Sequence, residues 1–276
     1  NFLSSERVSS REDQILNNVF STLLNSGFFE ITTNSLTTNK LRKFSYWDNE
    51  KTVEMINKLS DEHAILKQKL LFTSLDSIRY NINRKQKNLK FFEFDKAYSL
   101  EEKEYKESSK IGIYITGLKQ EEHFVNKPEN VSFFDVINIT NKVLNIARIS
   151  DFETKPKADS KTLDMCVEII SNGVVLGEIG MVKKEILKTF EISQDVYHAE
   201  IDWPNLIMNF DKEFKFSEIP KFPQVQRDLS LVMNKDVKYN EVISVIDLNK
   251  NKILKKVSLY DIYEGDSIGS NRIAYS

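Results

Sequence analysis

The sequence predicts an α+β fold built on a mainly antiparallel sheet. Three amphipathic helical patterns are interspersed with about seven strand-like segments, and the strands do not alternate regularly with the helices. Several strands instead follow one another as hairpins. The clearest case surrounds Asn172-Gly173, a pair that tolerates the positive φ angles of a type I′ turn. A doubly wound parallel sheet needs a helix between successive strands, so the pattern disfavours it.

The composition is that of an ordinary globular protein. Of the 276 residues, 40% are hydrophobic and 29% are charged, and the formal net charge is −2. This total neither supports nor excludes a nucleic-acid partner, because a local basic patch is sufficient. The one cysteine, Cys166, cannot form an internal disulfide, and no apolar stretch reaches the ~20 residues of a membrane span. We therefore expect a cytoplasmic protein with no membrane partner.

The first half of the chain is expected to supply two helices and several strands. A helix is predicted over Ser9–Ser26, with Ser9 and Glu12 as a capping box. A strand follows at Phe28–Thr33, and a second helix starts near Ser60. Further along, the pattern predicts strands over Lys90–Ser99 and Ile111–Gly117, and the charged run Glu101–Lys110 between them is interpreted as a solvated loop.

The next part contains a third helix, predicted over Ser132–Ala147 with Phe134 facing inward. After the Asn172-Gly173 hairpin comes a short helix, then an alternating strand that ends at Trp203. His198 lies on the polar face of that strand, so we expect it at a surface or an interface.

The last segment reads differently from the rest. Pro220 and Pro223 stiffen a linker, after which the pattern is strand, helix (Asn240–Leu248), strand, strand. A complete ferredoxin-like unit adds a second helix and a fourth strand, which the chain does not reach. We therefore predict two domains, residues 1–215 and 216–276, and expect the strand at Asp228–Met233 to be an exposed edge.

No catalytic or metal site is predicted. The glycine group formed by Gly173, Gly177 and Gly180 lacks the lysine-hydroxyl pair of a phosphate loop, so hairpin geometry is favoured over phosphate binding. Cys166 alternates with apolar neighbours and is interpreted as a buried residue. The histidines do not have metal-ligand spacing, which argues against structural zinc: His63, His123 and His198.

Two basic stretches leave alternatives open. The first contains Arg84, Lys85, Lys87 and Lys90. It is either a solvated loop or a contact to RNA or phosphate. In the second, lysines adjoin two tyrosines, which suits phosphate neutralisation with base stacking: Lys250, Lys252, Lys255, Lys256, Tyr260 and Tyr263. However, residues 216–276 contain 9 basic and 8 acidic residues, so the electrostatic argument is weak.

Read in order, these segments resemble a known family. The segments are "NKLSDEHAILKQKLLFTSLDSIRYNINRKQKNLKFFEFDKAYS", "IGIYITG", "NGVVLGEIGMVKKEILKTFEI", "VYHAEIDWPNL", "IPKFPQVQRDLSLVM" and "VSLYDIYEG". Together they look like the β chain of bacterial-type phenylalanyl-tRNA synthetase. The resemblance covers nearly the whole chain, and the ordered set is more specific than any single piece.

The resemblance implies a fold and a role. Residues 1–215 would form a class II synthetase-like module without catalytic activity, and residues 216–276 would begin a ferredoxin-like anticodon-binding domain. The family enzyme is an α₂β₂ tetramer whose α chain uses ATP and Mg²⁺ to charge tRNA(Phe) with phenylalanine. This chain is then expected to be a fragment that scaffolds the α chain and contacts tRNA, with no cofactor of its own.

Departures from the family pattern shape the expected site. Lys90 stands where class II chemistry would need an arginine, and no Gly-x-Gly-x-x-Arg motif is present. The loop after "YEG" ends in "GSNR" in place of Gly-Lys-Lys, which leaves Arg272 as the nearest RNA-contact candidate. The resemblance places tRNA contacts on Lys221, Arg227, Tyr260 and Arg272.

Two alternatives compete with this interpretation. In the first, Arg227 forms a structural ion pair or a turn hydrogen bond with Asp228 and does not contact RNA. In the second, the whole chain is a stand-alone, non-enzymatic paralogue that acts as a protein- or ligand-binding α+β module. The near-neutral charge of the last segment favours this alternative.

Overall fold

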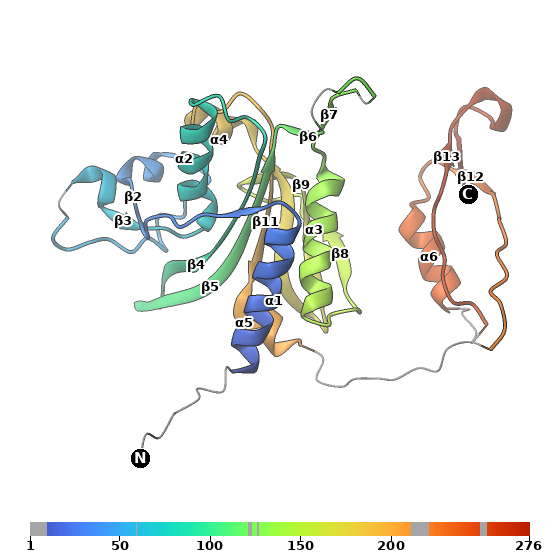
Figure 1. Ribbon diagram of the computed structural model, residues 1–276, viewed down its shortest axis with the longest axis horizontal. Coiled ribbons are helices and arrows are strands. Elements are labelled where there is room, and N and C mark those ends of the chain that lie inside the picture. Colours follow the sequence, from blue (N-terminus) through green and yellow to red (C-terminus); the bar gives the residue numbers. More distant parts are fainter. Residues whose placement is uncertain (1–9, 59, 121–122, 126, 211–220, 249–252) are drawn as a thin grey trace, which may run out of the picture. The chain divides into compact units, whose positions relative to one another are not determined.

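The computed structural model describes residues 10–58, 60–120, 123–125, 127–210, 221–248 and 253–276 (Figure 1). The chain divides into two compact units, Asn1–Phe214 and Lys215–Ser276. Among the described residues, no helix is long and apolar enough to cross a membrane.

The first unit is built on a seven-stranded sheet with the order β1-β4-β5-β11-β10-β9-β8. Its strands are β1 (Phe29–Glu30), β4 (Leu89–Glu101), β5 (Glu104–Thr116), β8 (Glu153–Pro156), β9 (Leu163–Ser171), β10 (Val174–Val182) and β11 (Val196–Asp202). All neighbouring pairs are antiparallel except β1 with β4. The mainly antiparallel α+β fold predicted from the sequence is therefore confirmed.

Helices cover both faces of this sheet (Figure 1). One face packs against α1 (Arg11–Asn25), α3 (Phe133–Ile146) and α5 (Trp203–Met208); the other packs against α2 (Leu70–Ile82), α4 (Lys184–Thr189) and the 3-10 turn η1 (Asn39–Lys43). Side chains alternate between the faces along each strand, so Phe92 joins the first core and Phe91 the second. The first half of β4 lies between the two cores and accordingly carries Leu89, Phe91, Phe92 and Phe94.

The second helix begins later than predicted. It starts at Leu70, not near Ser60, because β3 (Ile65–Leu66) pairs with β2 (Leu36–Thr37). The amide of Lys67 then donates to the carbonyl of Ser35 at 2.9 Å, which keeps the backbone extended up to α2. The 3-10 turn η2 (Asp61–His63) precedes this strand, and β6 (Leu118–Gln120) and β7 (Glu129–Asn130) form a further small hairpin.

The charged run Glu101–Lys110 is not the solvated loop that was predicted. Most of it opens β5, which pairs with β4 continuously as far as Glu101 opposite Glu104. Glu102 and Lys103 make the turn with φ angles of 50° and 67°. The side chains of this arm are exposed, and an ion pair of 2.7 Å between Lys96 and Glu107 joins the two strands, so a charged sequence is compatible with a strand here.

Local signals at the helix ends and turns are mostly confirmed. The capping box of α1 is formed by Ser10 and Asp13, one position after the predicted pair of Ser9 and Glu12, and Ser9 itself lies outside the described residues. Asn172 and Gly173 have φ angles of 50° and 76°, as the hairpin requires. Phe134, expected to face inward from α3, is instead 77% exposed, because the buried stripe of α3 runs through Val136 and Val143.

The second unit has the predicted order of strand, helix, strand and strand. Its elements are β12 (Leu231–Asn234), α6 (Tyr239–Leu248), β13 (Ile262–Tyr263), the 3-10 turn η3 (Asp266–Ile268) and β14 (Arg272–Tyr275). The antiparallel order is β12-β14-β13, so β12 is an edge of the described sheet, as predicted. Leu229, expected within that strand, precedes it and is exposed, and Pro220 lies outside the described residues.

Candidate functional site

The face of the sheet beneath α2 carries a buried lysine. Lys67 lies just before α2 and has no exposed side-chain surface. Its Nζ lies 2.7 Å from Oδ2 of Asp95 and 3.4 Å from Oε1 of Glu93, and it donates to Oγ1 of Thr33 at 2.9 Å. A buried cation is tolerated where such partners neutralise it. Lys67 and its partners therefore form an internal ion-pair network, and the Lys67 ammonium is not accessible to a ligand.

Glu93 has further donors around it. The amide of Thr33 donates to Oε1 at 2.8 Å, and the hydroxyl of Ser74 donates to Oε2 at 3.1 Å. Glu93 is 1% exposed, and Ser74 comes from α2, which lies directly over the strand. Both oxygens of this carboxylate are thus occupied by the protein itself, and the residue is not available to an external ligand.

A second polar cluster surrounds Glu178 on β10. Lys69 contacts Oε1 of this carboxylate, and Nζ of Lys157 lies 3.3 Å from Oε2. Burial acts to raise the pKa of Glu178, but the two lysines outweigh it and lower the pKa to about 2. Burial, followed by the charge of Glu178, raises the pKa of the Cys166 thiol to about 11. Cys166 is buried, as predicted, and as a protonated thiol it is a poor nucleophile.

His198 is buried, contrary to the prediction that it lies at a surface. Its strand, β11, lies between β5 and β10, so its polar face is covered by α2. The ring stacks on Tyr114 with centroids 4.7 Å apart, and Nδ1 lies 3.1 Å from the carbonyl oxygen of Ile113. Burial lowers the pKa of His198 despite the nearby carboxylate of Glu200, so the imidazole is neutral at pH 7.

Glu200, like Glu93, is occupied by a hydrogen bond within the protein. Its Oε2 accepts a hydrogen bond from the amide of Leu70 at 3.1 Å, at the N-terminus of α2. A carboxylate at this position also interacts favourably with the helix dipole. Sequence reasoning missed this role, because the two residues are 130 positions apart.

Lys90 does not belong to this face. It was interpreted as standing where a catalytic arginine is expected, but it alternates with Phe91 and therefore points to the side of α1 and α3. The α2 side of β4 carries Glu93 and Asp95, and Lys67 forms an ion pair with each of them. Within the parts of the chain that the structure describes, no three His, Cys, Asp or Glu side chains gather to hold a metal.

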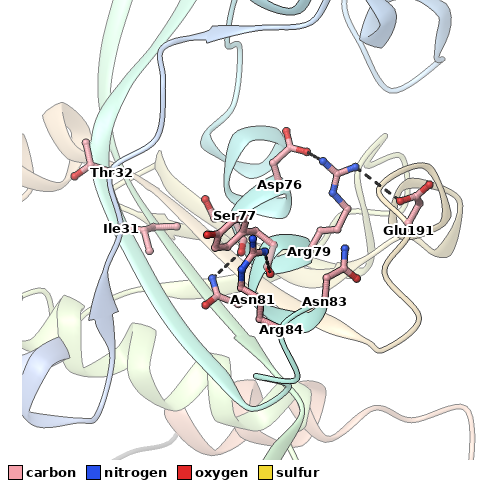
Figure 2. A pocket seen from close by; sticks show the side chains of 10 residues that line it. Ile31, Thr32, Asp76, Ser77, Arg79, Asn81, Asn83, Arg84 and Glu191 are labelled. Carbon is pink, nitrogen blue, oxygen red and sulfur yellow. Dashed lines mark hydrogen bonds and ion pairs between the residues drawn. The ribbon is translucent and has the colours of Figure 1, made fainter.

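An open hollow of about 660 Å³ lies at the C-terminal end of α2 (Figure 2). The guanidinium of Arg84 stacks over the Tyr80 ring at 3.4 Å. Arg79 pairs with Asp76 at 3.0 Å and, more distantly, with Glu191 at 4.0 Å. Two cations and two anions therefore line the hollow, which does not strongly favour either sign of ligand.

The first basic stretch of the sequence, which contains Arg84 and Lys90, is divided between the two sides of the sheet. Arg84 lines the hollow, whereas Lys90 lies on the opposite side of the sheet, so the stretch is not one continuous patch. Arg84 also donates to the carbonyl of Tyr80 at 3.0 Å, which ties it to the end of α2.

In the second unit, the predicted tRNA-contact residues are all exposed. Lys221 and Arg227 lie in the segment before β12, and Nη1 of Arg227 donates to the carbonyl of Gln226 at 3.1 Å. Among the described residues, Arg227 makes this hydrogen bond and forms no ion pair with Asp228. The amide of Tyr260 donates to the carbonyl of Ser276 at 2.9 Å, and Arg272 opens β14.

The sheet register separates these residues into two groups. Leu231 pairs with Tyr275 at one end of β12, and Asn234 pairs with Arg272 at the other. Arg227 and Tyr260 lie beyond the first end, four residues before Leu231 and two residues before Ile262, which also pairs with Tyr275. By this register Tyr260 is about five residues from Arg272 along the sheet, roughly 16 Å. The four residues are therefore not brought to a single point.

The register also identifies a tyrosine that the site prediction omitted. Tyr263 pairs with Ala274, two positions from Arg272, so Tyr263 and Arg272 share one face of the sheet. Tyr275, on the other face, contacts Tyr239 of α6 with ring centroids 5.6 Å apart. The face of Tyr263 is thus the one away from α6, and Tyr263 is 46% exposed on it. The sequence alone does not separate Tyr263 from the nearby Tyr260 as a candidate; the strand pairing is what places Tyr263 on the same face as Arg272.

Comparison with known proteins gives the family. Residues 4–203 match the family model described as the phenylalanyl tRNA synthetase beta chain CLM domain. Residues 220–276 match the ferredoxin-fold anticodon binding domain. The chain belongs to the phenylalanyl-tRNA synthetase beta chain family. The family resemblance predicted from the ordered motifs is therefore confirmed.

Curated relatives carry the same description. The phenylalanine–tRNA ligase beta subunit of Bacteroides thetaiotaomicron is 30% identical over 99% of this chain and 35% of its own length. The corresponding subunits of Porphyromonas gingivalis and Bacillus subtilis are 31% and 29% identical over 92% and 91% of this chain. The chain spans about a third of the length of the relatives that it matches.

The fold of the first unit also has a solved counterpart. Pyrrolysyl-tRNA synthetase from Desulfitobacterium hafniense superposes with a TM-score of 0.58 at 14% identity, over 74% of this chain and 71% of that one. At this identity the likeness concerns the fold alone. It confirms the class II synthetase-like architecture predicted from the sequence.

Proposed function

We propose that this chain is a non-catalytic part of the β subunit of a phenylalanine–tRNA ligase. In this role it scaffolds the α subunit of an α₂β₂ enzyme and contacts tRNA(Phe) in the cytoplasm, while the α subunit uses ATP and Mg²⁺. The observation that carries the proposal is the pair of family matches, which follow each other in order over residues 4–203 and 220–276.

The closed sheet face supports the non-catalytic role. Lys67 forms ion pairs with both Glu93 and Asp95 beneath α2, and Lys67 and Glu93 are almost fully buried. Nucleotide binding at this face would require preorganised groups that are open to the ligand. The buried groups instead make hydrogen bonds and ion pairs within the protein.

The second unit supports the RNA-contact role. Tyr263 and Arg272 share the sheet face away from α6, an arrangement that suits base stacking with phosphate neutralisation. Lys221, Arg227 and Tyr260 are exposed and add candidate contacts toward the other end of the sheet. We propose Arg272 and Tyr263 as the first pair to test.

Co-expression with a cognate α chain tests the scaffold role. We expect the two chains to co-purify, and we expect the chain alone to give no phenylalanine-dependent ATP–pyrophosphate exchange. Robust ATP–pyrophosphate exchange by the isolated chain would contradict the non-catalytic assignment. Failure to co-purify with the α chain, together with failure to bind tRNA, would favour the stand-alone paralogue, which the near-neutral charge of residues 216–276 also motivates.

Substitutions in the second unit test the RNA contact. In a complex that charges tRNA, Arg272→Gln and Tyr263→Ala are expected to raise the KM for tRNA(Phe) about tenfold with little change in the KM for phenylalanine. Lys188→Gln on α4 provides a control with the same loss of charge outside the second unit. Equal effects of Lys188→Gln and Arg272→Gln would show that general electrostatics, and not a contact, is responsible.

A further inference from the structure

A second, smaller hollow lies on the side of the sheet opposite to α2. It has a volume of about 180 Å³, and it is bounded by β4, β5, β6, α3 and the turn after α1. Three lysines line it: Lys90 from β4, Lys119 from β6 and Lys142 from α3. Its floor is apolar, with Phe28, Ile115, Val131 and Ile139 each less than 9% exposed.

Only one of the three lysines is neutralised by the protein. Nζ of Lys119 lies 3.1 Å from Oδ1 of Asp135 and 3.5 Å from Oε1 of Glu129. Asp135 is further engaged by the amide and hydroxyl of Ser132, at 2.8 and 2.7 Å, in the capping box of α3. Among the described residues, Lys90 and Lys142 form no ion pair, although both line the same hollow.

The lining of the hollow carries three lysines and one carboxylate, that of Asp135, so positive charge is in excess. Like charges repel each other, and this repulsion is stronger where apolar walls exclude water. Lys90 is also partly buried, and among the described residues it has no counter-ion. The other polar groups of the lining are Ser26 and Asn138, which can donate hydrogen bonds to an oxyanion.

We propose that this hollow binds a phosphate group. A phosphate monoester carries about −1.5 to −2 charges at pH 7, which matches the two unpaired lysines. Lysine suits phosphate as a flexible point charge that needs no bidentate geometry. The volume corresponds to roughly six waters at about 30 Å³ each, enough for a phosphate and a few waters but not for a nucleoside. The group is thus either free phosphate or the terminal phosphate of a larger ligand that stays outside.

The test is a phosphate titration of the 276-residue chain at constant ionic strength, with thermal unfolding as the readout. We expect a saturable rise of Tm with inorganic phosphate that chloride does not reproduce. Lys142→Gln should weaken the apparent affinity about tenfold, because one charge-assisted hydrogen bond is lost. Lys142 is exposed on α3, so this variant keeps the core intact, and Lys90→Gln is the second variant.

The matched control is Lys184→Gln. Lys184 is also an exposed helical lysine, but it lies on α4, on the other side of the sheet, so its substitution should not change the titration. Equal weakening by Lys184→Gln and Lys142→Gln would overturn the proposal in favour of general electrostatics. The absence of a saturable Tm change in the wild-type chain would overturn it as well, unless the oligonucleotide measurement shows the site.

Two oligonucleotides distinguish the sources of the phosphate. A short oligoribonucleotide with a 5′-phosphate is compared with the same sequence lacking it, by direct binding to the wild-type chain. A preference for the phosphorylated form that disappears in Lys142→Gln would assign the site to a terminal phosphate of RNA. Saturable binding of inorganic phosphate with no such preference would assign it to free phosphate. If the chain shows neither behaviour, the proposed site is overturned.

Discussion

Lys67 illustrates how a single side chain fixes the character of the sheet face. Its charge is fully buried and lies between two carboxylates, of which Glu93 is 1% and Asp95 26% exposed. Such a pair contributes little net stability compared with apolar residues, because desolvation offsets the attraction. Removal of one partner is costly, however, since the other charge stays buried alone.

The first prediction concerns this lysine. Lys67→Met should lower the free energy of unfolding by about 3–5 kcal/mol, measured by urea unfolding, because Glu93 is left without its cation. Adding Glu93→Gln should recover part of the loss. Lys96→Met, which breaks the exposed pair with Glu107, should leave the urea midpoint almost unchanged. Equal effects at the two lysines would contradict the buried network.

Glu178 gives a prediction for pH dependence. Its pKa is lowered from 4.5 to about 2 in the folded chain, so the ionised form stabilises the fold by about 3 kcal/mol above pH 4.5. This contribution is lost as the pH falls from 4.5 through about 2. Glu178→Gln should therefore be less stable at pH 7, and its difference from the wild type should shrink over that range. Urea unfolding curves that stay equally separated from pH 7 to pH 2 would contradict this assignment.

At the scale of elements, β10 and β11 pack so closely that a glycine is required. A Cβ at Gly177 would lie 2.3 Å from the carbonyl oxygen of Glu200 and 3.0 Å from Cα of Ile201, both backbone atoms of β11. Neither atom belongs to a flexible side chain, so the strand itself would have to shift. The glycine group predicted to serve hairpin geometry thus includes one residue that sets a strand-to-strand distance.

Gly177→Ala is therefore expected to destabilise the chain by about 1–3 kcal/mol or more, measured by urea unfolding. Val175→Ala, at an exposed position of the same strand, is the control and should have a small effect. If Gly177→Ala unfolds at the wild-type urea concentration, the pairing of β10 with β11 must differ from the register described above.

The elements that sequence reasoning predicted well depend on local signals. The apolar spacing of α1 and α3, and the Asn172-Gly173 turn, need only neighbouring residues. The errors arose where distant segments decide the outcome. β5 begins within a charged run because β4 pairs with it, and His198 is buried because β5, β10 and α2 surround its strand.

The same limit applies to the candidate sites. The exposure of Lys221, Arg227, Tyr260 and Arg272 could be anticipated from their polar surroundings. Their separation along the sheet could not, because it depends on the pairing of β12 with β14. The network of Lys67 was equally hidden, since its partners are 26 or more positions away in the sequence.

At the scale of the whole molecule, the two units differ in how much they bury. Among the described hydrophobic residues of the second unit, only Ile273, Ala274 and Tyr275 are buried. The first unit has two extensive cores, one on each face of its sheet. A small core cannot offset the entropy of ordering as well as a large one, so the second unit should be the less stable.

Hydrogen exchange followed by mass spectrometry checks this difference. The amides of β12 and β14 should exchange faster than those of β4 and β5, and they should open at lower denaturant concentration. The paired centres of β4 and β5 serve as the internal control. Exchange of both regions in one cooperative event would contradict independent opening of the second unit.

The position of β11 has a consequence for how the first unit folds. The hairpins β4–β5 and β9–β10 join neighbouring segments, so closing each of them costs little chain entropy. β11 then inserts between the two hairpins and pairs on one side with β5, far away in the sequence. Long-range pairing of this kind is slow, so we expect β11 to dock last and to set the refolding rate. Because the hairpins form before this step and β11 docks during it, all of these strands are paired in the transition state, and substitutions that weaken β11 or either hairpin should slow refolding more than they speed unfolding.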